Sequence, residues 1–287
     1  MKKKLFAYLL ALVGMATFSA CTEEAGTEPG GDSQPSVVLY QYTVSANEGN
    51  ADNDTHLRVA VNNQVSDIYY LAEPTDTHDA YIESNGEEAY RQYVVDNGTQ
   101  VTVTDGVADF YVTGLFGAYT ITVVGVGSNN ALCAANATFF GYTWNTLATG
   151  RVVAALLDGT FEFTVAPGFT LQQRDDDPDV YRIQNLYGNG YHLIIRAQGE
   201  PQTETGDFFE QEGVSYKTVV FETLGTPYSY GDYGQISLSD YATYAGDQNY
   251  LYYNRLYANN YLYAQSIYTV SAGYLAQGYV QFVPDRE

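Results

Sequence analysis

The chain has 287 residues, more than one average domain requires, so its length predicts two domains. Only 12 lysines and arginines stand against 34 aspartates and glutamates, which gives a net charge of −22. A surface this acidic repels nucleic-acid phosphates and anionic lipid headgroups, so the composition excludes nucleic acid as a partner. Hydrophobic residues at 45% and aromatic residues at 15% are enough for packed cores, which excludes a wholly disordered chain.

Residues 1–20 have the pattern of an export signal. A basic start at Lys2, Lys3 and Lys4 is followed by an apolar run that ends at Phe18. This run is short for a membrane-spanning helix and is typical of a secretory signal peptide. Removal of the three lysines with the signal leaves a mature charge of 9 − 34 = −25.

Four residues at the end of this signal, Phe18-Ser19-Ala20-Cys21, resemble a bacterial lipobox. The resemblance implies that Cys21 becomes the first mature residue and carries acyl chains such as palmitate, so that its partner is outer-membrane lipid. Buried acyl chains contribute about 0.8 kcal/mol per methylene, which makes such an anchor essentially permanent. The alternative is an ordinary signal peptide with a coincidental cysteine.

Residues 21–36 are acidic and rich in Gly, Pro and Ser, a composition that predicts a flexible tether. Glu23 and Glu24 resemble the export signal of surface lipoproteins from Bacteroidetes-type bacteria. That resemblance implies display on the outer face of the outer membrane, with the periplasmic face as the alternative. Acylation of Cys21 leaves Cys133 alone, so we expect no intramolecular disulfide and interpret Cys133 as a core residue.

Residues 37–141 predict a first β-rich domain. Leu57, Val59 and Val61 alternate with polar or small residues, and a strand over 68–71 is stopped by Pro74. The dipeptide Asp105-Gly106 suits a type I′ turn, so we expect a hairpin between strands at 99–104 and 107–112. Between Asp79 and Asp96 the apolar spacing changes and predicts one short inserted helix, with Asn97-Gly98 as its stop.

The segment VTGLFGAYTITVVGV (112–126) resembles the last strands of a fibronectin type III-like β-sandwich. In this segment Gly-Leu precedes a tyrosine, as it does in that family, although the interval from Leu115 to Tyr119 is shorter. The resemblance implies a sandwich for the first domain, which alternating strands over about 100 residues also predict.

Residues 142–287 predict a second, Tyr-rich β-sandwich-like domain. Strands at 152–157 and 160–165 flank Asp158-Gly159 as a hairpin, and their alternation places Phe161, Phe163 and Val165 on the inner face. Trp144, Leu147 and Gly150, followed by the segment at 181–188, resemble a β-rich carboxy-terminal domain of uncharacterised Bacteroidetes surface lipoproteins. The whole chain is therefore expected to be all-β, and this resemblance implies no established activity.

Tyrosine is concentrated in one part of the second domain. The segment from Tyr228 to Tyr279 carries 14 of the 29 tyrosines, with asparagines such as Asn249, Asn254, Asn259 and Asn260 among them. Alternating tyrosines at this density are explained most simply as rings that line strands with their hydroxyls in water. The alternative is a stacking surface for sugar rings, with amides as hydrogen-bonding groups. Its candidate residues are Tyr250, Tyr252, Tyr261 and Tyr263.

Few residues of the sequence fit a catalytic or metal-binding pattern. The sequence has no nucleophile elbow, zinc-binding His-Glu-x-x-His pair or phosphate loop, so we assign no catalytic residue. His56, His78 and His192 lack the spacing of zinc ligands. The oxygen-rich sites that could hold structural calcium are Asp52-Asn53-Asp54 and the clustered carboxylates Asp175, Asp177 and Asp179. Neither has the pattern of an EF-hand, and for the second cluster solvation in a turn is the favoured alternative.

The sequence therefore predicts a lipid-anchored cell-surface protein without enzymatic activity. We expect its Tyr-rich domain to contact an extracellular glycan or a surface protein. A surface glycan hydrolase is one alternative, because the pair of carboxylates that it needs meets only in space. A fimbria-type structural subunit is the other, although Arg58 and Arg91 lie inside predicted elements instead of before a removable amino-terminal strand.

Overall fold

A computed structural model describes residues 34–45, 48–128, 130–204, 209 and 211–286. The predicted signal peptide, the lipobox with Cys21 and the tether as far as residue 33 lie outside the described residues. The chain divides into two compact units, one made of Met1–Thr43 and Asp54–Phe140 and the other of Val44–Asn53 and Gly141–Glu287. The sequence had assigned the segment 44–53 to the first domain. It belongs to the second unit because Asp52 pairs with Arg182, and Asn53 donates a hydrogen bond to the Tyr142 carbonyl.

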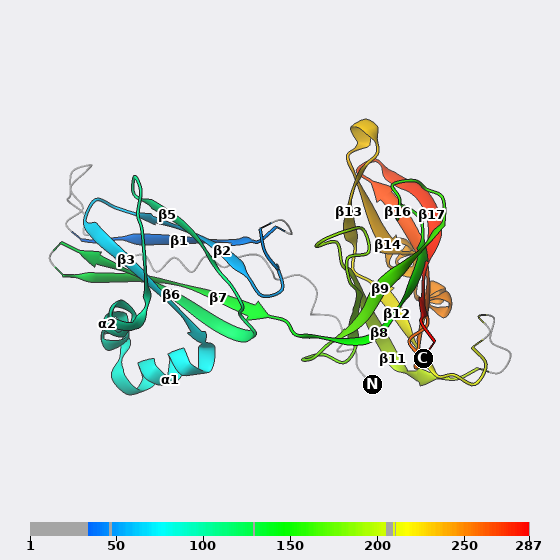
Figure 1. Ribbon diagram of the computed structural model, residues 1–287, viewed down its shortest axis with the longest axis horizontal. Helices are drawn as coiled ribbons and strands as arrows, with labels where there is room; N and C mark the ends of the chain where they lie inside the picture. Colours follow the sequence, from blue (N-terminus) through cyan, green and yellow to red (C-terminus); the bar gives the residue numbers. More distant parts are fainter. Residues whose placement is uncertain (1–33, 46–47, 129, 205–208, 210, 287) are drawn as a thin grey trace, which may run out of the picture. The chain divides into compact units, whose positions relative to one another are not determined.

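The first unit is a two-layered antiparallel β fold. One sheet has the order β1-β2-β5 and the other β4-β3-β6-β7. Figure 1 shows the sheets as two layers at the blue-to-green end of the chain. The core between them contains Leu57, Val59, Ile68, Ile121 and Val123, all fully buried. The strands are β1 (Val37–Thr43), β2 (Thr55–Val61), β3 (Val65–Pro74), β4 (Thr99–Val101), β5 (Val107–Val112), β6 (Gly117–Gly127) and β7 (Leu132–Gly141).

Two helices, not the single predicted one, cover the outer face of the four-stranded sheet (Figure 1). They are α1 (Thr75–Asn85) and α2 (Glu87–Asn97), and α2 ends at the predicted Asn97. Gly86 separates them because its φ of 85° and ψ of 160° lie outside the helical region. Tyr90 and Val94 of α2 pack on Val124, so β6 is buried on both faces. That burial explains the nearly continuous apolar run along β6.

The turn at Asp105-Gly106 forms as predicted, but the strands beside it do not pair with each other as a hairpin. Asp105 and Gly106 have φ of 51° and 77°, and Thr104 and Val107 exchange two backbone hydrogen bonds. Beyond that single bridge, β4 pairs with β3 and β5 pairs with β2, so the turn connects the two sheets. Turn chemistry is local, whereas the sheet that a strand joins depends on distant residues.

The second unit is a ten-stranded antiparallel sheet, which confirms the all-β class. β17 pairs with both β8 and β16, so the sheet curls until it closes and its opposite walls face one another across a single core. That core contains Leu171, Leu193, Ile195, Tyr268 and Phe282. The strands are β8 (Trp144–Ala154), β9 (Thr164–Arg174), β10 (Val180–Ile183), β11 (Leu193–Gln202), β12 (Tyr216–Phe221), β13 (Leu224–Ser229), β14 (Gln235–Asp240), β15 (Arg255–Tyr257), β16 (Leu262–Val270) and β17 (Gly273–Pro284).

Short helices fill two connections in the second unit. They are η1 (Gly231–Tyr233) and then α3 (Tyr241–Ala245) with η2 (Gln248–Tyr253). Asp240 begins α3 by accepting a hydrogen bond from the Thr243 amide, and its other oxygen accepts from the Phe221 amide. Among the described residues, no helix is long and apolar enough to cross a membrane.

The β8–β9 hairpin exists, but the predicted inner face of its second strand is wrong. Phe161, Phe163 and Val165 are exposed by 37%, 42% and 61%. The connection is longer than the predicted two residues, since β8 ends at Ala154 and Leu156 turns into the core. The Phe163 ring instead packs against Gly278 and stacks on Tyr279 at 4.5 Å.

Candidate functional site

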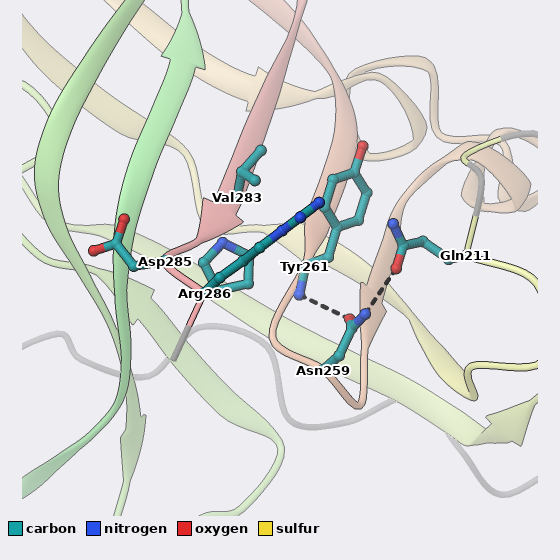
Figure 2. A pocket seen from close by; sticks show the side chains of 7 residues that line it. Gln211, Asn259, Tyr261, Val283, Asp285 and Arg286 are labelled. Carbon is teal, nitrogen blue, oxygen red and sulfur yellow. Dashed lines mark hydrogen bonds between the residues drawn. The ribbon is translucent and has the colours of Figure 1, made fainter.

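A depression of about 320 Å³ lies where the β15–β16 turn meets the end of β17. Figure 2 shows Tyr261, Asn259 and Gln211 on one side of it and Val283 and Asp285 on the other, with the Arg286 side chain extended between them toward the tyrosine ring. The seven lining residues are Gln211, Asn259, Tyr261, Val283, Pro284, Asp285 and Arg286. They bring one aromatic ring, two amides, a carboxylate and a guanidinium together.

Hydrogen bonds fix the polar groups on the turn side of the depression. Asn259 donates from its side-chain nitrogen to the Gln211 oxygen at 2.7 Å and accepts from the Tyr261 amide at 3.2 Å. The Tyr261 hydroxyl accepts from Gln281 at 2.6 Å. The turn itself closes through Asn260, whose φ of 67° is a conformation that asparagine tolerates well. The ring and the amides are therefore held in place before any ligand binds.

The opposite wall is fixed to β8. The Asp285 amide donates to the Thr149 carbonyl at 2.8 Å, and the Asp285 carboxylate accepts from the Thr149 hydroxyl at 3.0 Å. Among the described residues that line the depression, Asp285 carries the one carboxylate, whereas glycosidic-bond hydrolysis uses a pair.

A buried arginine, Arg255, organises the tyrosines behind the β15–β16 turn. Its guanidinium lies over the Tyr216 ring at 4.2 Å and the Tyr252 ring at 4.5 Å, and it pairs with Glu204 at 3.0 Å. Arg255 is fully buried, and its Nε donates to the Tyr252 carbonyl at 2.9 Å. We call Arg255, Glu204, Tyr216, Tyr252 and Phe209 the Arg255 cage, because rings and a carboxylate surround the cation.

Burial and the Glu204 carboxylate shift the pKa values of Tyr216 and Arg255. Desolvation and the hydrogen bond that Tyr216 donates to Glu204 at 2.9 Å raise the pKa of Tyr216 to about 12. Burial alone lowers the pKa of Arg255, but its hydrogen bonds to Tyr257 and Glu204 reverse that effect, and the net pKa is raised. Arg255 therefore stays charged and Tyr216 stays neutral across the physiological range.

The four candidate tyrosines lie in different surroundings. Tyr250 and Tyr252 are on η2, not on a strand, and Tyr250 meets Tyr241 edge-on at 4.4 Å. Tyr252 belongs to the Arg255 cage and is half exposed. Tyr261 lines the depression. Tyr263, on β16, stacks on Tyr279 at 5.4 Å and contacts Phe209 at 4.5 Å. They lie on different elements and do not form one flat platform, and Tyr261 lines the depression.

The acidic turn after β9 is partly neutralised by two basic side chains of the protein. Arg174 pairs with Asp176 at 2.6 Å and with Asp177 at 3.5 Å, and Lys217 pairs with Asp179 at 2.6 Å. Asp175 accepts a hydrogen bond from Asn145. In the part of the chain that the structure describes, no group of three or more His, Cys, Asp or Glu side chains is arranged to hold a metal ion.

The three histidines lie apart and have local partners. His56 stacks on Tyr111 at 4.6 Å, His78 bonds to Asp79 at 2.7 Å, and the His192 ring accepts from the Asn185 amide at 3.0 Å. Desolvation and the positive charge of Arg182 lower the pKa of His192, and Asp52 opposes that shift. His192 is therefore held neutral beside the Asp52–Arg182 pair.

Of the polar lining residues, the sequence pattern indicates Asn259 but not Gln211, Asp285 or Arg286. These three are ordinary polar residues in the segment before β12 and at the chain end, and no spacing connects them with Tyr261. Arg255 did carry a signal, because it is the sole basic residue between Tyr228 and Tyr279. A single arginine in a tyrosine-rich segment indicates a guanidinium that stacks on aromatic rings.

Comparison with known proteins finds few similarities to this chain. No family model and no curated protein matches the chain. Among solved structures, the chain is similar to a cycloalternan-degrading enzyme from Trueperella pyogenes in complex with cycloalternan, with 12% identity and a TM-score of 0.26. The similarity covers 82% of this chain and 31% of that enzyme. At this TM-score the likeness carries no argument about fold or function.

Proposed function

We propose that the protein is a lipid-anchored surface protein whose second unit binds a glycan at the Tyr261 depression. The observation that supports binding is the set of groups around it: a fixed tyrosine ring with amides, a carboxylate and a guanidinium. Sugar rings present apolar C–H faces that pack on aromatic rings and hydroxyls that bond to amides and carboxylates. We propose binding in place of cleavage because the described lining residues include one carboxylate, Asp285, and not the pair that hydrolysis uses.

A glycan array probed with the full chain and two variants tests this proposal. Tyr261→Ala removes the ring and should abolish or strongly reduce binding to every glycan that the wild-type protein retains. Tyr274→Ala is the matched control, because Tyr274 is 58% exposed and does not line the depression. Equal retention by both variants would refute the Tyr261 site. Release of reducing ends from a bound polysaccharide would favour the hydrolase alternative.

The anchor is proposed on the residues before the described chain. The lipobox pattern that ends at Cys21 supports acylation there, and the acidic residues that follow support display at the cell surface. Cells grown with labelled palmitate should incorporate the label into the wild-type protein but not into Cys21→Ser. Digestion of intact cells with protease separates outward display, in which the protein is degraded, from a periplasmic position, in which it is protected.

A further inference from the structure

The outward face of the three-stranded sheet in the first unit carries exposed aromatic residues. Side chains of alternate residues point away from the core that holds Leu57 and Val59. Four of them are large and exposed: Val38 at 41%, Tyr40 at 50%, Tyr42 at 46% and Tyr111 at 39%. We call this surface the β1 face. It consists of Val38, Tyr40 and Tyr42 on β1, His56, Arg58 and Ala60 on β2, and Val107, Asp109 and Tyr111 on β5.

Such a composition is unusual for the solvent side of an antiparallel sheet, which is commonly polar. Within the same unit, the outer face of the other sheet is covered by α1 and α2. On the β1 face the charged groups neutralise one another, since Asp109 lies 3.3 Å from His56 and 3.4 Å from Arg58. The face is thus close to neutral on a chain whose net charge is −22.

The rings on this face hold one another in place. His56 stacks on Tyr111 with centroids 4.6 Å apart and planes 17° apart, and Tyr42 lies 5.6 Å from His56 on the other side. Tyr40 is opposite Arg58 in the register and is the most exposed ring of the face. Tyrosine has few rotatable bonds, so a ligand that packs on this row orders little additional side-chain freedom.

The size of the face limits what it can bind. With neighbouring strands about 4.8 Å apart and a rise of about 3.3 Å per residue, it measures roughly 10 Å across by 13 Å along. That is a few hundred Å² at most, while a stable protein interface needs about 800 Å² per partner. A second copy would also bring two strongly acidic chains together. Size and charge both favour a small neutral ligand with apolar faces and hydroxyls.

We propose that the β1 face is a binding site for a short neutral oligosaccharide. Pyranose rings would pack on Tyr40 and on the Tyr42–His56–Tyr111 row, and their hydroxyls would bond to Arg58 and Asp109 at its centre. The site is independent of the Tyr261 depression, because all its residues belong to the first unit.

Titration of the full chain with maltohexaose, cellohexaose and mannohexaose tests the site, with hexagalacturonate as the anionic comparison. The readouts are calorimetry and the NMR signal of the His56 ring, assigned with a His56→Gln variant. A neutral hexasaccharide should shift the His56 signal and hexagalacturonate should not. The double variant Tyr40→Ala/Tyr42→Ala should weaken the affinity for the neutral hexasaccharide that shifts His56 at least tenfold. Tyr274→Ala should leave this affinity unchanged.

The outcome is separable from that of the Tyr261 proposal. Tyr261→Ala should preserve the ligand-induced shift of His56, and the Tyr40→Ala/Tyr42→Ala variant should preserve binding at the depression. Circular dichroism of the double variant shows whether the first unit remains folded. If it does not fold, the milder Tyr40→Ser variant replaces it. The proposal is overturned if no neutral hexasaccharide moves the His56 signal, or if sedimentation shows self-association that the Tyr40 variants abolish.

Discussion

Replacement of Arg255 by alanine tests whether the Arg255 cage stabilises the second unit. The substitution removes a cation that stacks on two rings, at 4.2 and 4.5 Å, and pairs with Glu204 at 3.0 Å. Breaking a buried ion pair costs about 3–5 kcal/mol, because the remaining charge loses its partner. Glu204 is 31% exposed and regains water, so the lower end of that range, about 3 kcal/mol, is expected here.

Urea unfolding followed by tryptophan fluorescence measures this loss in the intact chain. Trp144 is the single tryptophan and lies in the second unit, so its emission reports the unfolding of that unit. For a unit of this size, 3 kcal/mol corresponds to a decrease in melting temperature of about 6–12 °C. Arg255→Lys should give a smaller loss, because lysine keeps the charge but not the planar stacking group.

Arg196→Ala is the matched control in the same unit. Arg196 pairs with Glu222 at 2.5 Å, but both side chains are nearly half exposed, so the expected loss is at most about 1 kcal/mol. If Arg255→Ala and Arg196→Ala unfold at the same urea concentration, burial between rings does not strengthen the Arg255 pair. The stabilising role of the cage would then be refuted.

Three further predictions concern packing and protonation. Gly150→Ala should lower the free energy of unfolding by about 3 kcal/mol, the upper end of the usual cost of overpacking, because its Cβ would lie 2.4 Å from the Val283 carbonyl oxygen. Urea unfolding measures this loss. The stability of the second unit should fall as pH rises from about 10 to about 12, because the pKa of Tyr216 is raised in the folded state and the unfolded chain therefore loses this proton first. Tyr216→Phe should make the fall shallower, and unfolding curves measured across this pH range test it. Asp52→Asn should lower the pKa of His192 further, since the one neighbour that raises it is removed, and NMR titration of the His192 ring should show the decrease.

The local features of the fold could be predicted from the sequence because neighbouring residues determine them. β3 ends at Pro74, α2 ends at Asn97, and Asp105-Gly106 adopts the two positive φ values of its turn. In each case the responsible chemistry lies within a few residues, as the fixed φ of proline or the permissive backbone of glycine.

The errors arise where distant residues decide. Phe163 has the spacing of an inner-face residue, yet its ring packs against Gly278, a residue that is distant in the sequence. The length of the β8–β9 connection changes which face each later residue takes, and a shift of one position reverses an entire strand. Gly86 divides the helical segment because one residue with positive φ interrupts two helix-compatible stretches.

The candidate site also combines residues that are neighbours in the sequence with residues that are distant in it. Tyr261 and Asn259 share one turn, so both were visible in the sequence. Gln211 and Arg286 reach that turn through the pairing of β12 with β15 and of β17 with β16. The aromatic residues of the β1 face alternate in the same way as residues of a core. An alternating pattern shows that two faces differ, but it does not show which face the rest of the molecule covers.

The distribution of charge connects the two proposed sites. Basic residues are few, and several are paired with carboxylates of the protein. Arg182 and Arg255 are buried beside Asp52 and Glu204, and Lys217 pairs with Asp179 at the surface. The acidic excess therefore remains uncompensated on most of the surface, which repels anionic ligands. At the β1 face Arg58 is balanced by Asp109, and at the depression Arg286 stands beside Asp285. The described charges of both proposed sites are thus balanced, and a neutral sugar would bind there without the electrostatic cost that an anionic ligand would meet.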